Sequence, residues 1–156
     1  MDSLMQSLRP ATNADEAEAR ALLYQVLAEY GLTPDPDGAD SDLDDIEANY
    51  FDRGGYFGVI EQDGKMIATV GLWPMSEEEI ELRKMYLLPE ARGRGLGTKL
   101  LMEMFTRARK RGYQRMSLET ASQLKEAIGL YKKHGFERVY PEHLTDRCDQ
   151  AYVFEL

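Results

Sequence analysis

The chain has 156 residues, of which 43% are hydrophobic, and a formal net charge of −9. This length fits one domain over residues 1–156, and the acidic charge argues against a nucleic-acid partner, because neutralising phosphates needs a basic surface. The sequence has no apolar run near the ~20 residues of a membrane span, no secretory signal in MDSLMQSLRP, and one cysteine, Cys148, so we expect a cytoplasmic protein without a membrane partner or an internal disulfide.

The N-terminal part predicts a strand, a long helix and an acidic loop. Residues 5–12 (MQSLRPAT) read as a first strand. The next apolar residues repeat at the spacing of one buried helical face, and Gly31 suits the left-handed position that ends a helix. These residues are Ala19, Leu22, Leu23, Val26, Leu27 and Tyr30. The Pro-, Gly- and Asp-rich residues 35–45 read as a solvated loop, with a short helix capped by Ser41.

The middle of the chain predicts an antiparallel meander. Residues 56–62 (YFGVIEQ) and 65–75 (KMIATVGLWPM) are strand-like, and Asp63-Gly64 between them suits a hairpin turn. In the next strand, EIELRKMYLLP, the apolar residues Ile80 and Leu82 are at even-numbered positions, whereas Met85 and Leu87 are at odd-numbered positions. A change of phase of this kind indicates a β-bulge around Arg83 and Lys84.

The C-terminal part alternates helices and strands. A helix begins near Gly95 and closes at Gly112, and a second helix carries Leu124, Ala127, Ile128 and Tyr131 and stops at Gly135. RMSLET, FERVY and AYVFEL read as three further strands. The order of elements predicts an α/β fold with a mixed sheet.

The stretch MYLLPEARGRGLGTKLL places three glycines and two arginines where a strand turns into a helix. A helix N-terminus exposes unpaired N–H groups and about half a unit of positive charge, so it attracts anions. Gly93, Gly95 and Gly97 leave the backbone open, and Arg92 and Arg94 add positive charge, so the stretch predicts a cradle for a pyrophosphate. Three alternatives fit less well. The chain lacks the Gly-Lys-Ser/Thr of a P-loop, and it has Thr98 where a dinucleotide-binding fingerprint requires its third glycine. A glycine-rich turn without a ligand would leave the pattern unexplained.

These residues resemble the GNAT superfamily of acyl-CoA-dependent N-acyltransferases. Arg92-x-x-Gly95-x-Gly97 matches its R/Q-x-x-G-x-G/A signature. ELRKMYLLPEARGRGLGTKLL resembles its fourth strand and third helix, and SLETASQLKEAIGLYKKHGF its fifth strand and fourth helix. The resemblance implies a mostly antiparallel, twisted sheet of about six to seven strands, flanked by helices and splayed between strands four and five, where pantetheine would lie.

The resemblance also implies acetyl-CoA as co-substrate and no metal. The amides of residues 93–98 would hold the pyrophosphate, and a backbone N–H around Met85 or Tyr86 would stabilise the reacting oxyanion. The residues expected to bind the co-substrate are Met85, Tyr86, Leu87, Arg92, Gly93, Arg94, Gly95, Leu96, Gly97, Thr98 and Lys99.

Transfer to an amine requires an acid and a base, since an aliphatic amine with a pKa near ~10 is mostly protonated at neutral pH. By resemblance, Tyr131 protonates the leaving thiolate; the alternative is a core aromatic side chain. Glu119 is the first candidate for the base, although it could instead bind backbone at the strand end, and Glu81 is the second. A base elsewhere, or water alone, is the remaining alternative.

The sequence therefore predicts an N-acetyltransferase that acetylates an amine of a small molecule or peptide by direct attack in a ternary complex. The alternatives are an acyl-CoA sensor without catalysis and a nucleotide-binding domain. His143, Asp146 and Cys148 match no zinc spacing, and a homodimer is an open alternative because GNAT proteins often dimerise. The acceptor site would be built by the N-terminal half and the loop PEHLTDRC, and the acidic residues 35–45 could favour a cationic acceptor.

Overall fold

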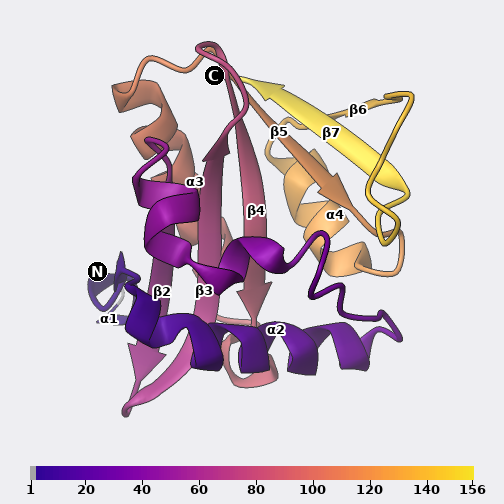
Figure 1. The fold of residues 1–156 in the computed structure, drawn as a ribbon. Coiled ribbons are helices and arrows are strands. Elements are labelled where there is room, and N and C mark those ends of the chain that lie inside the picture. Colours follow the sequence, from indigo (N-terminus) through magenta and orange to yellow (C-terminus); the bar gives the residue numbers. More distant parts are fainter. Residues whose placement is uncertain (1–2) are drawn as a thin grey trace.

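The computed structural model describes residues 3–156, in which helices cover both faces of one sheet (Figure 1). The strands are β1 (Arg9–Pro10), β2 (Tyr56–Gln62), β3 (Lys65–Pro74), β4 (Glu79–Leu87), β5 (Arg115–Thr120), β6 (Glu137–Val139) and β7 (Gln150–Glu155). The helices are α1 (Ser3–Gln6), α2 (Glu16–Glu29), α3 (Leu96–Lys110) and α4 (Lys125–Lys133). Shorter helical turns are η1 (Asn13–Asp15), η2 (Ser41–Asp44), η3 (Glu47–Phe51) and η4 (Pro89–Ala91).

The described strands form a seven-stranded sheet in the order β1-β2-β3-β4-β5-β7-β6. Neighbours are antiparallel except β4 and β5, which run parallel because α3 crosses over between them. The predicted α/β fold with a mixed, mostly antiparallel sheet is confirmed. Asp63 and Gly64 both have positive φ, at 53° and 78°, as the predicted turn between β2 and β3 requires.

The strands β4 and β5 separate soon after they meet. Glu79–Glu81 pair with Arg115–Ser117, but in the described chain the ladder goes no further, although β4 continues to Leu87. Figure 1 shows the two strands diverging along their length. The predicted splay is therefore present, and the backbone groups of β4 that face it lack a strand partner on that side.

A β-bulge lies in β4 at the splay. Thr69 pairs with Tyr86 and Gly71 with Arg83, so Lys84 and Met85 together oppose a single residue of β3. Lys84 adopts φ 52°, and the Thr69 hydroxyl donates to its carbonyl oxygen at 2.7 Å. The bulge predicted around Arg83 and Lys84 is confirmed.

The core consists of two apolar layers, one on each face of the sheet. On one face lies α2, together with η2 and η3 (Figure 1). The predicted apolar stripe of α2 is buried as far as Leu27, while Tyr30 follows the helix and is half-buried. On the other face lie α3 and α4, where Phe105 stacks on Phe154 at 4.4 Å between ring centroids. Helix α3 begins after Gly95, which has φ 73°, as the sequence predicts.

Two local predictions in the N-terminal part are wrong. Residues 5–12 do not form one strand, because α1 extends to Gln6 and only Arg9–Pro10 pair with β2. Ser7 closes this helical turn through its hydroxyl, which donates to the Leu4 carbonyl oxygen at 2.8 Å. The predicted short helix is split into η2 and η3, and Ser41 does not cap it, since its hydroxyl donates to the Gly38 carbonyl oxygen.

Among residues 3–156, no helix combines the length and the apolar character needed to cross a membrane.

Candidate active site

Two cavities open into the splay between β4 and β5. The larger, about 440 Å³, is walled by β4, the end of β5, the loop after α2 and the loop before β7. The smaller, about 250 Å³, is walled by β4, the C-terminal part of α2, the glycine-rich loop and α4. Both are lined by Met85, Tyr86, Leu124 and Tyr131, so they meet at these residues.

The smaller cavity contains most of the residues predicted to bind the co-substrate. Those that line it are Met85, Tyr86, Leu87, Arg92, Gly93, Gly95, Leu96, Gly97 and Thr98. Arg94 and Lys99 are exposed and do not line it, and Arg94 Nη1 lies 3.4 Å from Gln62 Oε1. The apolar walls of this cavity were not predicted from the sequence, although the helical periodicity of their residues was visible. These walls are formed by Val26, Tyr30, Ala127 and Leu130.

The glycine-rich loop leaves the N-terminus of α3 open. Gly93 and Gly95 have φ of 75° and 73°, and a Cβ at either would meet no heavy atom within 4 Å. The N-cap position of α3 has no side-chain capping bond. The first N–H groups of this 15-residue helix therefore face an unobstructed, electropositive site.

Arg92 has structural partners as well as a place on the cavity wall. Its Nη1 and Nη2 donate to the two carboxylate oxygens of Glu29 at 2.8 and 3.1 Å, and its Nε donates to the Leu87 carbonyl oxygen at 3.0 Å. Arg92 thus ties the glycine-rich loop to α2 and to the end of β4. Its contact with a phosphate stays a prediction.

Tyr131 lies where the two cavities meet. Its side chain is buried, and its ring packs edge-on against Phe136. Burial, with a smaller contribution from Tyr86, raises the pKa of Tyr131 well above the ordinary value for a phenol. The hydroxyl therefore stays protonated at neutral pH and is able to donate a proton or a hydrogen bond.

The two predicted base candidates both line the larger cavity but differ in environment. Glu81 is 7% exposed and accepts a hydrogen bond from Arg83 Nε. Burial raises the pKa of Glu81, and this outweighs the lowering effect of Arg83. Glu119 Oε1 instead accepts hydrogen bonds from the Thr145 backbone N–H at 3.0 Å and the Thr145 hydroxyl at 3.4 Å. Glu119 thus makes the strand-end contact that was the alternative to a catalytic role.

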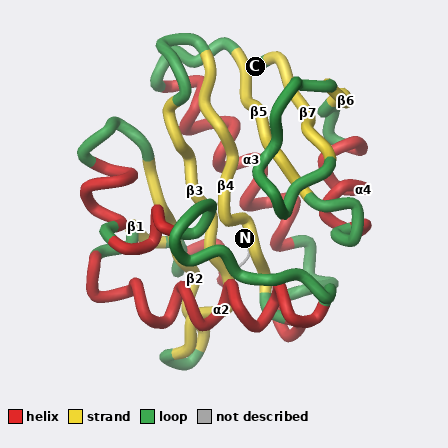
Figure 2. The backbone as a smooth tube through the Cα atoms, turned by 45° about the vertical axis from the view of Figure 1, so that its right-hand side comes forward, coloured by secondary structure: helices red, strands yellow, loops and turns green. Residues whose placement is uncertain are grey.

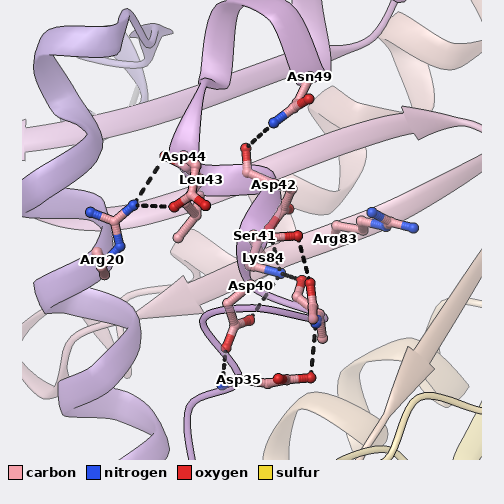
Figure 3. Close-up of polar contacts among 12 residues, drawn as sticks. Arg20, Asp35, Asp40, Ser41, Asp42, Leu43, Asp44, Asn49, Arg83 and Lys84 are labelled. Carbon is pink, nitrogen blue, oxygen red and sulfur yellow. Dashed lines mark hydrogen bonds and ion pairs between the residues drawn. The ribbon is translucent and has the colours of Figure 1, made fainter.

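A buried group of charges, which we call the Lys84 cluster, stands beside the larger cavity and comprises Lys84, Asp40, Asp42 and Arg147. Figure 3 shows the first three of these side chains. Lys84 Nζ lies 3.2 Å from Asp40 Oδ1 and 3.3 Å from Asp42 Oδ1, and it donates to the Ala39 carbonyl oxygen at 3.0 Å. Arg147 binds both oxygens of Asp40, at 2.7 and 2.8 Å.

The Lys84 cluster corrects in part the expectation that residues 35–45 form a solvated loop, because residues 36–38 and 44–45 are exposed but two aspartates between them are not. Asp40 and Asp42 are only 2% and 5% exposed, and their charges are balanced by Lys84 and Arg147. Figure 2 shows the loop after α2 lying in front of β4, where the bulge holds Lys84. The cluster therefore joins three distant segments that wall the larger cavity, and these two carboxylates are not free to bind a cationic acceptor.

The larger cavity also contains residues that the sequence did not single out for the site, chiefly Arg83 and Arg147. The sequence did contain one signal for Arg83. The parity of the apolar residues in β4 changes at this point, and such a change marks where the side chains of a strand switch sides. Thr145, Arg147 and Cys148 of the loop PEHLTDRC also line this cavity, and their contact with an acceptor stays a prediction. Within residues 3–156, no group of three or more His, Cys, Asp and Glu side chains is arranged to hold a metal ion.

Known proteins are similar to this chain in sequence or in fold. The chain matches the acetyltransferase (GNAT) family model over residues 20–136. It is 41% identical over 137 residues to the "Uncharacterized N-acetyltransferase YjgM" of Escherichia coli (strain K12), covering 85% of this chain and 82% of that protein. The fold resembles an acetyltransferase of the GNAT family from Staphylococcus aureus Mu50 with TM-score 0.88 and 21% identity, over 95% of this chain and 97% of that one. It also resembles a GNAT family acetyltransferase from Elizabethkingia anophelis with acetyl-CoA bound, with TM-score 0.66 and 18% identity, over 96% and 97% of the two chains.

The Lys84 cluster should make a large contribution to stability at neutral pH. Burial alone would raise the pKa of Asp40, but bonds from Arg147 and the Asp35 N–H, with the charge of Lys84, bring it down from 3.8 to about 2. The lowered pKa means that the stabilisation is complete above about pH 4 and is lost as pH falls through about 2. We expect Asp40→Asn to lower the free energy of unfolding by about 3 kcal/mol at pH 7, with a smaller deficit near pH 3, measured by urea unfolding.

Asp44→Asn is the matched control, because Asp44 lies in the same acidic segment but pairs with Arg20 at the surface. We expect this variant to lose less than about 1 kcal/mol. Equal losses from Asp40→Asn and Asp44→Asn would contradict the role given to the cluster.

Proposed function

The chain belongs to the acetyltransferase (GNAT) family, and we propose that it transfers the acetyl group of acetyl-CoA to an amine by direct attack in a ternary complex. The resemblance predicted from the sequence is confirmed by the family match and by the N-acetyltransferase relative. The observation that carries the proposal is the meeting of the two cavities at Met85, Tyr86, Leu124 and Tyr131. One cavity would admit the donor and the other the acceptor, so that the reacting atoms come together without a covalent enzyme intermediate.

The smaller cavity fits acetyl-CoA, which supplies an activated acyl group as a thioester. The open backbone at Gly93 and Gly95 and the N-terminus of α3 suit the pyrophosphate. The apolar walls from Val26, Ala127 and Leu130 suit the pantetheine arm. A structural neighbour with acetyl-CoA bound supports the same assignment.

The exposed edge of β4 would stabilise the charge that develops on the thioester oxygen. Beyond Glu81, β4 has no strand partner in the splay, so N–H groups around Met85 and Tyr86 are available as donors there. Met85 and Tyr86 directly follow Lys84 in the bulged part of the strand, and both line the two cavities. Neutral Tyr131 would donate its proton to the leaving thiolate as the C–S bond breaks.

Glu81 is the base that we favour over Glu119. A base is needed to remove the proton from the ammonium form of the acceptor before its nitrogen attacks. Burial raises the pKa of Glu81 and so makes it a stronger base than an exposed carboxylate. Glu119 shares one of its oxygens with Thr145 and is better placed to orient the acceptor.

A cytoplasmic location and a homodimer remain predictions of this proposal, and so does the expected lack of nucleic-acid and membrane partners.

The test of the function is acetyl-CoA turnover over a panel of amines, measured by release of the free thiol. We expect at least one amine to be acetylated, and Tyr131→Phe to lower kcat by about 100-fold with the KM for acetyl-CoA within about 3-fold, because only the proton donor is removed. Tyr140→Phe is the control, since Tyr140 is 81% exposed. Tight binding of acetyl-CoA in calorimetry without transfer to any amine would instead favour an acyl-CoA sensor.

The pH profile of kcat/KM should identify the base. Glu81 must be ionised to accept a proton, so activity should fall as pH falls through its raised pKa, above the ordinary value of 4.5. We expect Glu81→Gln to remove this acidic limb and lower kcat by about 100-fold. Glu119→Gln should keep the limb. If Glu119→Gln abolishes the limb and Glu81→Gln preserves it, the two roles are reversed.

A further inference from the structure

The larger cavity contains an arginine held in a fixed orientation. Arg83 stands on β4 directly before the bulge, and its side chain is 27% exposed. Its Cζ lies 4.0 Å from the centre of the Trp73 ring, and Arg53 Cζ lies 3.9 Å from the same centre. The guanidinium groups of Arg53 and Arg83 both lie against the indole ring, and this contact restricts the plane of Arg83.

Arg83 has hydrogen-bond donors that the described residues do not use. Its Nε donates to Glu81 Oε1, but among residues 3–156 no hydrogen bond or ion pair involves its Nη1 or Nη2. Figure 3 shows the Arg83 side chain pointing away from the Lys84 cluster. The outer edge of the guanidinium, formed by Nη1 and Nη2, is therefore available to a ligand in the cavity.

The other two cations of this cavity are already neutralised. The Nζ of Lys84 is surrounded by Ala39, Asp40 and Asp42, and Arg147 is bound to Asp40. Within the described chain, Arg83 is thus the cation of the cavity whose two terminal nitrogens, Nη1 and Nη2, both lack a protein partner. An acceptor that contains an anionic group would find its partner there.

Carboxylates stand close to Arg83 on the same side of the sheet. Glu81 is two residues before it on β4, and Glu119 lies two residues beyond Ser117, the partner of Glu81. Both glutamates line the larger cavity, and Glu119 acts on the pKa of Glu81, so the two are near each other. A cation with free donors and two carboxylates complement a ligand that contains both an ammonium and a carboxylate group.

We propose that the acceptor is an amino acid, a small amine with a free carboxylate that the Nη1 and Nη2 groups of Arg83 bind. This inference rests on the proposed acetyl transfer and specifies its acceptor. The planar guanidinium matches a carboxylate through two parallel hydrogen bonds. The ammonium end then lies toward Glu81 and Glu119, where it loses its proton before the nitrogen attacks the thioester carbon. A cavity of about 440 Å³ suits a small molecule.

The test compares each acceptor with its own carboxamide, which keeps the amine and removes the charge. The panel contains the standard L-amino acids, β-alanine and γ-aminobutyrate, each offered to the full chain with acetyl-CoA. We expect the best amino acid to exceed its carboxamide in kcat/KM by at least about 10-fold. Arg83→Met also removes the bond to Glu81, which acts on both acceptors alike, so the informative quantity is the ratio of kcat/KM for that amino acid to kcat/KM for its carboxamide. We expect Arg83→Met to lower this ratio by about 30-fold.

The comparison of the amino acid with its carboxamide distinguishes direct binding of the carboxylate by Arg83 from an indirect effect of Arg83 through Glu81. If Arg83 acted only by orienting Glu81, Arg83→Met would slow both acceptors equally, and this result would overturn the proposal. Turnover of the carboxamide by Arg83→Met also shows that the variant is folded. Arg53→Met, which removes the other partner of Trp73 but no residue of the cavity wall, should leave the ratio of the two acceptors unchanged.

The failures of the two proposals are distinguishable. Acetylation of polyamines or of amidated peptides at rates equal to or above those of every amino acid would overturn the acceptor class and leave the acetyl transfer intact. No transfer to any amine by the unaltered protein would overturn the acetyl transfer itself.

Discussion

The separation of β4 from β5 is the constraint on which the rest of the site depends. Parallel strands usually stay paired along their shared length, yet here the ladder ends at Glu81 and Ser117. The unpaired edge of β4 leaves polar backbone groups that need other partners, since buried N–H and C=O groups are costly when unsatisfied. The same opening creates both cavities and exposes the donors that an acyl transfer requires.

The Lys84 cluster explains how the opening keeps its shape. A non-glycine residue in the left-handed region costs about 1 to 2 kcal/mol, and Lys84 adopts φ 52° within the bulge. The contacts of its ammonium group with Asp40 and Asp42 offset this cost and fix the bulge against the loop after α2. Arg147 extends the same contacts to the loop before β7, so that one network of charges positions three walls of the larger cavity.

Features set by neighbouring residues were predictable from the sequence. The hairpin at Asp63-Gly64, the start of α3 after Gly95 and the bulge at Lys84 all follow from local backbone preferences or from the parity of apolar residues. The burial of Asp40 was not predictable, because its partner Arg147 is 107 residues away in the chain. The ion pair of Arg92 was not predictable either, since its partner Glu29 is 63 residues away, in α2.

The charges of the larger cavity divide into those that are balanced within the protein and those with unused capacity. The Lys84 cluster belongs to the first kind. Arg83 and Glu81 form an ion pair with each other but belong to the second kind, because Nη1 and Nη2 of Arg83 take part in no hydrogen bond or ion pair among the described residues. Glu81 is subject to two opposing influences, burial that raises its pKa and Arg83 that lowers it. A carboxylate bound to Arg83 would draw on the same positive charge and weaken the lowering influence. The bound carboxylate would in this way raise the pKa of Glu81, while the ammonium group beside Glu81 would lower it until the proton is transferred.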